Sequence, residues 1–354
     1  MLKLLAFLSI FTMLNVSFLN TEWPTTPTPI KGIYVTADSV TTDTKFRQLL
    51  KIIEKTDLNA MVIDVKDDEG MLTYNSDLSI VHKIQSDQNA PIKDLSKLLQ
   101  KLKEKNIYTI ARIVVFKDPY LAKKKPEWAI KDKSGDLWKD ASGIKWVDPH
   151  RQEVWNYNIS IAKEVAQLGF DEIQWDYVRF PDYKNIDEEV TFAPSGYKSK
   201  EATIGSFLQH AYTKLKTPKI TISADVFGLT TSVKNDMGIG QRWETIAQFV
   251  DVISPMMYPS HYADGNYGIP SPEANPGLLI KAGLKDAITK NKNSFSQGKS
   301  IAVIRPWLQD FSMKVPYSLK EVNAQIRAAN DLGINEYLLW NAKNEYSMQE
   351  NAAN

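Results

Sequence analysis

The sequence of 354 residues contains no cysteine and only four histidines. Without cysteine, disulfides, thiolate metal sites, iron–sulfur clusters and cysteine nucleophiles are excluded. The histidines, at positions 82, 150, 210 and 261, are scattered along the chain and show no metal-binding spacing. We therefore expect neither a metal ion nor another cofactor in this protein.

An excess of charge of either sign is also lacking. The 43 lysines and arginines balance 42 aspartates and glutamates, which leaves a formal net charge of +1. This balance gives no electrostatic signal for a nucleic-acid partner or for an anionic membrane surface. Aromatic residues, by contrast, make up 10% of the chain. Aromatic side chains beyond the needs of a core often line ligand clefts.

Long hydrophobic runs are confined to the N-terminus. Lys3 precedes LLAFLSIFTML at residues 4–14, an apolar run with the length of a signal-peptide core. The run is short for a membrane span of about 20 residues. We therefore predict a signal peptide or signal anchor over residues 1–20 and an extended Thr/Pro linker over residues 21–30. The chain is expected to be secreted or held at the cell surface, with membrane contact only through this anchor; its oligomeric state is not indicated.

From residue 31 onward, short β-branched runs alternate with segments of helical period. Strict alternation predicts parallel strands joined by helical crossovers. Eight such units predict a single-domain (β/α)8 TIM barrel over residues 31–345, with a short or missing eighth helix and a tail at 346–354. An open doubly wound sheet is the alternative, but no glycine-rich phosphate loop follows the first run. We see no internal repeat beyond this alternation. The predicted strands are 31–38, 59–68, 107–116, 170–180, 219–228, 250–259, 300–311 and 334–342. The predicted helices are 44–56, 94–105, 150–168, 200–216, 243–249, 276–291 and 318–332.

Polar and aromatic side chains gather at the C-terminal ends of the predicted strands, where a barrel of this type places its chemistry. They include no Ser-His-Asp arrangement and no phosphate cradle. Two carboxyl groups, hydrogen-bonding side chains and aromatic faces are what a site for glycosidic bonds requires, so we expect a polysaccharide or oligosaccharide substrate. The candidate catalytic residues are Asp176 and Asp225, and the candidate substrate-binding residues are Asp64, Lys66, Arg112, Arg179, Tyr258, Trp307, Gln309, Trp340 and Asn341.

Asp176 and Asp225 end adjacent predicted strands, which lie about 4.8 Å apart. Their carboxyl groups could then sit about 5–6 Å apart, the separation of a retaining glycosidase. Asp64 or Asp310 could supply the second carboxyl group in place of Asp225. Asp225 could also serve only as a hydrogen-bond partner of a loop backbone, and Asp176 only as the buried partner of a nearby arginine.

The substrate-binding candidates have structural alternatives as well. Asp64 and Lys66 share one side of their predicted strand and could pair with ions of neighbouring strands. Arg112 lies inside an apolar strand, so a carboxylate partner is expected for it whatever the function. Trp307 and Trp340 could pack at the end of the barrel.

Several motifs together resemble a bacterial family of glycoside hydrolase domains. They are KGIYVTAD, NAMVIDVKDDEGMLTY, IARIVVFKDP, GFDEIQWDYVRFP, ISADVFG, SPMMYPSHY and RPWLQDF, and the likeness runs from about Lys31 to Asn344. The resemblance implies a (β/α)8 barrel and a carbohydrate substrate. In related sugar-cleaving barrels an aspartate at the end of the fourth strand is the nucleophile, and Asp176 occupies the matching place.

Two other functions stay open at this point. The first is a carbohydrate-binding barrel that has kept its cleft and lost its catalytic acid. The second is a different hydrolase, such as a metal-dependent esterase or deacetylase, against which the small number of histidines argues.

Overall fold

A computed structural model describes residues 28–197 and 199–348 of the chain. The predicted signal or anchor segment lies outside these ranges, as do most of the predicted linker and the end of the tail. Within the described part, no helix combines the length and the apolar character that crossing a membrane requires.

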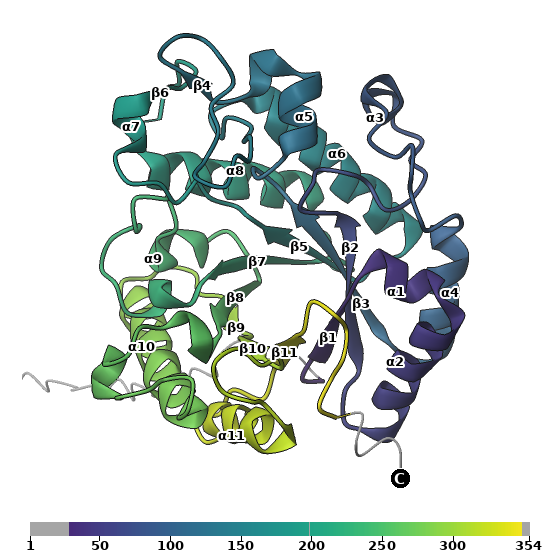
Figure 1. The fold of residues 1–354 in the computed structure, drawn as a ribbon, viewed down its shortest axis with the longest axis vertical. Coiled ribbons are helices and arrows are strands. Elements are labelled where there is room, and N and C mark those ends of the chain that lie inside the picture. The colour runs from purple at the N-terminus through teal and green to yellow at the C-terminus, as the bar shows by residue number, and fades with distance from the viewer. Residues whose placement is uncertain (1–27, 198, 349–354) are drawn as a thin grey trace, which may run out of the picture.

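Eight parallel strands close into a barrel surrounded by helices (Figure 1), which confirms the predicted (β/α)8 fold. Each barrel strand pairs with its neighbour along the chain, and the last strand, β11, pairs with β1. The barrel therefore has no open edge, and the C-terminal ends of all its strands face one way. The barrel strands are β1 (Lys31–Val35), β2 (Ala60–Lys66), β3 (Tyr108–Val114), β5 (Glu172–Asp176), β7 (Thr221–Phe227), β8 (Val252–Met257), the seventh strand in two pieces, β9 and β10 (Val303–Ile304 and Trp307–Gln309), and β11 (Tyr337–Trp340).

The seventh barrel strand is interrupted, whereas the sequence pattern predicted one continuous strand over residues 300–311. β9 pairs with β8, and β10 pairs with both β8 and β11. Pro306 lies between the two pieces and has no N–H to contribute to a ladder, so the strand breaks there.

Helices cover the outside of the barrel because each has one apolar face. In α2, for example, Phe46, Leu49, Leu50 and Ile53 are buried at the spacing of one helical face. The seven predicted helices are all present, although α9 is shorter than predicted and α10 is longer. As predicted, no helix follows β11 up to residue 348. The helices are α1 (Ala37–Thr41), α2 (Asp43–Lys55), α3 (Ser79–Ile84), α4 (Leu95–Glu104), α5 (Pro119–Lys124), α6 (Gln152–Leu168), α7 (Ile186–Glu189), α8 (Lys200–Leu215), α9 (Trp243–Ile246), α10 (Pro276–Ser296) and α11 (Leu319–Asn330).

A buried ion-pair network occupies the inside of the barrel. The Arg305 guanidinium donates to Glu172 at 2.9 Å and to Glu336 at 2.8 Å, and all three side chains are nearly inaccessible to solvent. Because buried charges need partners that satisfy their hydrogen bonds, this network is structural. The charged side chains that can take part in chemistry lie instead at the C-terminal ends of the barrel strands.

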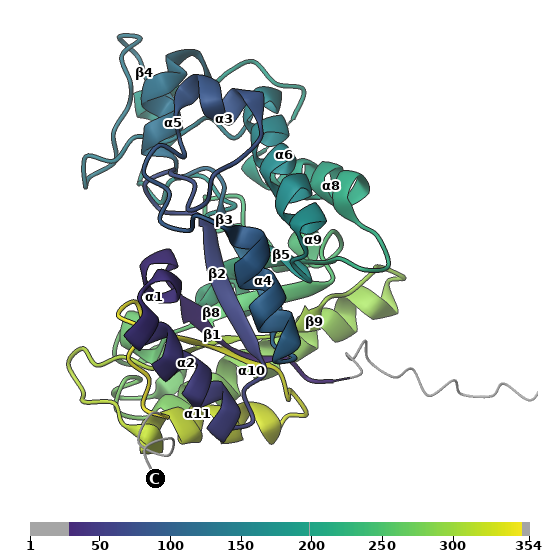
Figure 2. The same ribbon diagram turned by 90° about the vertical axis from the view of Figure 1, so that its right-hand side faces the viewer.

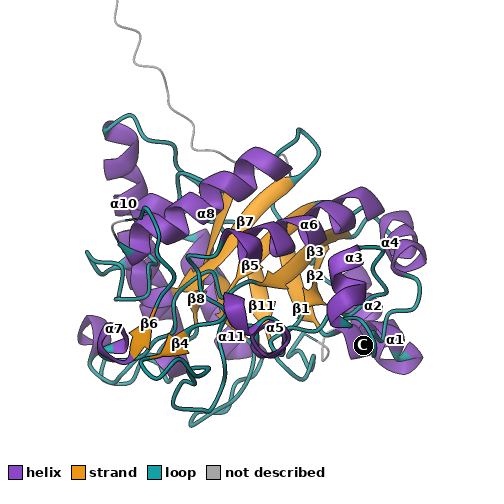
Figure 3. Ribbon diagram, turned by 90° about the horizontal axis from the view of Figure 1, so that it is seen from above, coloured by secondary structure: helices purple, strands orange, loops and turns teal. Residues whose placement is uncertain are grey.

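The long connections gather at that same end of the barrel. Figure 2 shows α3, α5 and β4 (Lys131–Asp132) together at one end of the molecule, away from α2 and α11. β4 pairs with β6 (Val190–Thr191) in a small antiparallel sheet, seen beside α7 in Figure 3. The connection between β5 and α7 contributes Tyr177, Arg179 and Asp182 to the lining of the candidate site.

Candidate active site

A cavity of about 460 Å³ opens at the C-terminal ends of β3, β5, β7, β8, β10 and β11. We call it the main cavity. It contains both predicted catalytic aspartates and five of the predicted substrate-binding residues. It is lined by Asp68, Arg112, Asp176, Tyr177, Arg179, Asp182, Asp225, Phe227, Gly228, Leu229, Met237, Gln241, Met256, Tyr258, His261, Tyr262, Trp307 and Trp340.

Asp176, the last residue of β5, is held in place by hydrogen bonds to both of its carboxylate oxygens. Oδ2 accepts from Nε and Nη2 of Arg112 at 2.9 and 2.6 Å. Oδ1 accepts from the backbone N–H of Tyr177 at 2.6 Å. These hydrogen bonds fix the orientation of the carboxylate, which faces the main cavity.

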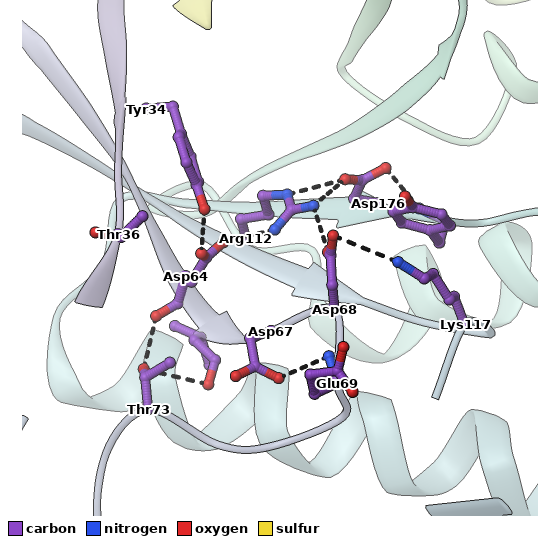
Figure 4. Close-up of polar contacts among 12 residues, drawn as sticks. Tyr34, Thr36, Asp64, Asp67, Asp68, Glu69, Thr73, Arg112, Lys117 and Asp176 are labelled. Atoms are coloured by element: carbon purple, nitrogen blue, oxygen red, sulfur yellow. Dashed lines mark hydrogen bonds and ion pairs between the residues drawn. The ribbon is translucent and has the colours of Figure 1, made fainter. Parts of the chain in front are cut away.

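Arg112 on β3 joins three carboxylates, as Figure 4 shows. Besides Asp176, its guanidinium donates to Asp64 at 2.7 Å and to Asp68 at 2.9 Å. The Tyr34 hydroxyl donates to the other oxygen of Asp64 at 2.5 Å. The expected carboxylate partner of Arg112 is thus present. Within the described residues, no group of three histidines, aspartates or glutamates is arranged to hold a metal ion.

Asp225 on β7 has a very different environment from Asp176. Its side chain is 2% exposed, and Oδ1 accepts from the indole N–H of Trp307 at 2.8 Å. Burial, reinforced by the negative charge of Asp176, raises the pKa of Asp225 well above its usual range. The main cavity therefore contains one carboxylate that is ion-paired with Arg112 and one buried carboxyl group whose pKa is raised.

Tyr177 turns the chain immediately after Asp176. Its φ of 48° lies in the left-handed region, which a tyrosine rarely adopts. This conformation directs its backbone N–H at the Asp176 carboxylate. Its ring packs on the Lys117 ammonium at 4.7 Å and on the Arg179 guanidinium at 5.0 Å. The turn thus accounts for the polar residues at the end of an apolar strand.

The two predicted tryptophans differ in exposure. Trp307 is 1% exposed and belongs to the packed interior of the barrel, where it also holds Asp225. Trp340 is partly exposed, stacks on Tyr34 with ring centroids 4.0 Å apart, and lines the cavity. The packing alternative therefore applies to Trp307, whereas Trp340 offers a face to a ligand.

Lys66 does not reach the main cavity, although we predicted it as a substrate-binding residue. Its ammonium is fully buried between Asp118 at 2.7 Å and Asn158 of α6 at 2.8 Å. The expectation that Asp64 and Lys66 share one side of their strand is wrong, because the ladder between β2 and β3 shifts register between them. Such a bulge reverses the alternation of side chains. Lys66 is the ion-paired residue of the structural alternative.

Removing the Lys66 ammonium should therefore affect stability and leave ligand binding unchanged. In Lys66→Met, the buried Asp118 carboxylate loses its counter-ion, which costs about 3–5 kcal/mol of the free energy of unfolding. Urea unfolding measures this loss, with Lys281→Met as the control because Lys281 pairs with Asp331 on the surface. A loss of ligand binding without a loss of stability in Lys66→Met would contradict this assignment.

A second cavity of about 600 Å³ lies beside the main cavity and shares Tyr258, His261 and Trp340 with it. Asp310 and Asn341 line this side cavity, so Asp310, one of the two alternative candidates for a second carboxyl group, does not line the main one. Burial raises the pKa of Asp310 to about 6.

Asn341 and Gln309 mainly hold the loops of this region. Asn341 donates to the Asp310 carbonyl, and Gln309 accepts from the Ser260 N–H at 3.0 Å. Gln309 is fully buried and lines neither cavity.

The sequence-based prediction missed a tandem repeat that packs behind two residues of the cavity wall, Tyr177 and Arg179. Residues 131–138 read KDKSGDLW and residues 139–146 read KDASGIKW. Both form a tight hairpin in which the aspartate side chain caps the turn. The second hairpin places Trp146 against Tyr177, with ring centroids 6.0 Å apart. The eight-residue period was the signal that could have revealed this unit.

Fold and site together define the class: a (β/α)8 barrel whose C-terminal face holds a cavity with two carboxyl groups of contrasting environment. The chain belongs to the family described as "Putative glycosyl hydrolase domain", which matches residues 32–346. The chain thus has a glycoside hydrolase-like domain.

Solved structures share this fold. A hypothetical protein from Ruminiclostridium thermocellum is 35% identical, with 58% of this chain and 98% of that one covered, at a TM-score of 0.50. The glycoside hydrolase domain of PgaB (BpsB) from Bordetella bronchiseptica is 12% identical, with 89% and 95% covered, at a TM-score of 0.61. The spore cortex-lytic enzyme SleL from Bacillus cereus is 11% identical, with 92% and 74% covered, at a TM-score of 0.53. No curated protein matches the chain in sequence.

Proposed function

We propose that this protein is a glycoside hydrolase that cleaves an extracellular or cell-envelope polysaccharide through Asp176 and Asp225. The observation that carries the proposal is the contrast between these two groups at one cavity. Asp176 is paired with Arg112, whereas Asp225 is buried and has its pKa raised. An ion-paired carboxylate and a buried carboxyl group at one cleft fit the roles of nucleophile and acid/base in a glycosidase.

In the proposed reaction, Asp225 donates its proton to the glycosidic oxygen as the bond from that oxygen to the anomeric carbon breaks. Asp176 attacks the same carbon and forms a glycosyl ester. Asp225, now ionised, takes a proton from a water molecule that hydrolyses the ester and releases Asp176. The net change is the addition of one water across the glycosidic bond, with retention at the anomeric carbon.

The polysaccharide substrate is supported by the size of the site and by the activities of proteins with similar structures. The main and side cavities share three lining residues, so together they offer room for more than one sugar ring. SleL is described as a spore cortex-lytic enzyme, and the PgaB structure is described as a glycoside hydrolase domain. The apolar run at residues 4–14 would export the barrel to such a substrate.

The direct test is the release of new reducing ends from a panel of bacterial exopolysaccharides and cell-wall glycans. The wild-type chain should release them from at least one glycan, and Asp176→Asn should not. If the wild type releases none from any member of the panel, the proposal fails. Purified protein that needs added metal for hydrolysis would favour the esterase or deacetylase class instead.

Trp340 should contribute a stacking face for a sugar ring. Its ring is partly exposed at the boundary of both cavities and already stacks on Tyr34. Trp340→Ala should weaken oligosaccharide binding by roughly tenfold, because stacking on an aromatic face contributes about 1 kcal/mol or more. Calorimetric titration measures the affinity, with thermal unfolding as a check on the fold. Unchanged affinity together with a large fall in Tm would assign Trp340 to packing alone.

A further inference from the structure

Arg179 is a buried cation without a carboxylate partner. Its side chain lines the main cavity, and the residue is 8% exposed. In the described part of the chain no carboxylate oxygen lies within 4.0 Å of its guanidinium. The one hydrogen bond it makes there runs from Nη1 to the Phe180 carbonyl at 3.0 Å. A guanidinium has five N–H donors, so most of its donors are not used by the protein.

Three aromatic rings hold the guanidinium in this position. Its central carbon lies 4.7 Å from the ring centroid of Phe227 and 5.0 Å from those of Trp146 and Tyr177. Trp146 is itself fixed, because its indole N–H donates to Asp140 at 2.9 Å within the second hairpin of the tandem repeat. The cation is therefore oriented before any ligand arrives, and a ligand that binds it loses little affinity to ordering.

Keeping a cation here is costly for the protein. Burial lowers the pKa of Arg179, even though Tyr177 and the carboxylates of Asp176, Asp182 and Asp140 favour its charged form from a distance. An arginine nevertheless stays charged in proteins, so the cost falls on stability. Arg112, which lines the same cavity, shows the usual solution, with three carboxylates bound directly to it.

We propose that Arg179 binds a carboxylate of the glycan, so that the substrate is an acidic polysaccharide with a carboxylate-bearing sugar. This inference rests on the proposed function for the same cavity and specifies its substrate class. A planar guanidinium matches a carboxylate with two parallel hydrogen bonds. Asp68, Asp176 and Asp182 also line the cavity, so a singly charged carboxylate meets less repulsion there than a doubly charged phosphate.

Pairs of oligosaccharides that differ only in charge test this inference. Binding of oligogalacturonate, hyaluronan and muramic-acid-containing glycan fragments is measured by calorimetry beside the methyl ester of each. The wild type should bind at least one acid roughly tenfold or more tightly than its ester, as charge-assisted hydrogen bonds require. Arg179→Met should abolish that preference, and Arg179→Lys should keep only part of it. If no acid binds more tightly than its ester, the inference is wrong.

Two further variants separate a binding role from a structural one. Asp182 is exposed and lines the cavity, so Asp182→Asn should strengthen binding of the acid by removing repulsion. If Asp182 instead served as the partner of Arg179, Asp182→Asn would lower Tm and leave the acid preference unchanged. Arg179→Met should keep or raise the wild-type Tm, because the buried charge is removed, whereas Arg47→Met on the exposed face of α2 should leave Tm unchanged. A fall in Tm with the acid preference intact would overturn the inference.

Failure of this inference and failure of the proposed function give different results. If the protein cleaves neutral glycans through Asp176 and binds no acidic glycan more tightly than its ester, it is a glycoside hydrolase without a carboxylate subsite. A chain that binds an acidic glycan through Arg179 and cleaves no glycan keeps the subsite and is a binding protein.

Discussion

Asp176→Asn should lower kcat on a cleaved glycan by about 10⁴-fold or more, since loss of a nucleophile removes the bond-forming group itself. The substitution keeps the size of the side chain and can still accept the Tyr177 N–H. Arg112 keeps Asp64 and Asp68 as counter-ions, so the fold should persist. We expect a Tm close to that of the wild type and nearly unchanged substrate affinity, so the loss should appear in kcat rather than KM.

The control for this variant is Asp77→Asn, an exposed aspartate on the connection before α3. It should keep full activity. Wild-type activity in Asp176→Asn would rule out Asp176 as the nucleophile. A similar loss in both variants would indicate damage to the preparation rather than to the site.

Asp225→Asn should lower kcat by about 10²–10⁴-fold, the usual contribution of a general acid or base. The asparagine can still accept the indole N–H of Trp307, so the packing should be kept. In the wild type, the active protonated form of Asp225 is lost as the pH rises through its raised pKa. Activity should therefore fall on the alkaline side in the wild type, and the residual activity of Asp225→Asn should lack this alkaline fall.

Stability should respond to pH in a linked way. Because the folded-state pKa of Asp225 is raised, the folded chain holds a proton that the unfolded chain releases. Its contribution to stability is greatest below the unfolded pKa of about 4 and is lost as the pH rises toward the folded pKa. Asp225→Asn should remove this contribution to the pH dependence, which urea unfolding at several pH values measures.

Azide provides a further check on the role of Asp225. In an acid/base variant, a small anion can attack the glycosyl ester in place of activated water. Azide should therefore restore turnover of an aryl glycoside by Asp225→Asn and yield a glycosyl azide. If activity stays unchanged in Asp225→Asn, the acid/base role belongs to another residue.

The sequence predicted the barrel well because its eight strands are short, apolar and separated by clear helical segments. The position of Asp176 at the end of β5 follows from the same pattern, since strand ends mark the catalytic face of a barrel. The two assignments that differ most from the structure arise from local irregularities. Pro306 interrupts the seventh barrel strand, and the bulge after Asp64 turns Lys66 away from the cavity.

Other parts of the site depend on tertiary contacts that a one-dimensional pattern does not contain. The contrast between Asp176 and Asp225 arises because Arg112 reaches one of them and Trp307 the other. Tyr34 on β1 enters the same network, although 30 residues separate it from Asp64. Asp68 is the last residue of the predicted strand 59–68, so its role was within reach of sequence reasoning.

The nucleophile assignment is tested most directly by intact-protein and peptide mass spectrometry of Asp225→Asn. The variant is incubated with the glycosyl fluoride of the sugar that the glycan panel identifies. Fluoride leaves from this substrate without acid assistance, so the glycosyl ester can still form. Hydrolysis of the ester should be slow, because its base is missing. We predict a mass increase of one glycosyl unit on the peptide that contains Asp176. A glycosyl adduct on another carboxylate, or turnover with an inverted product and no adduct, would contradict the account.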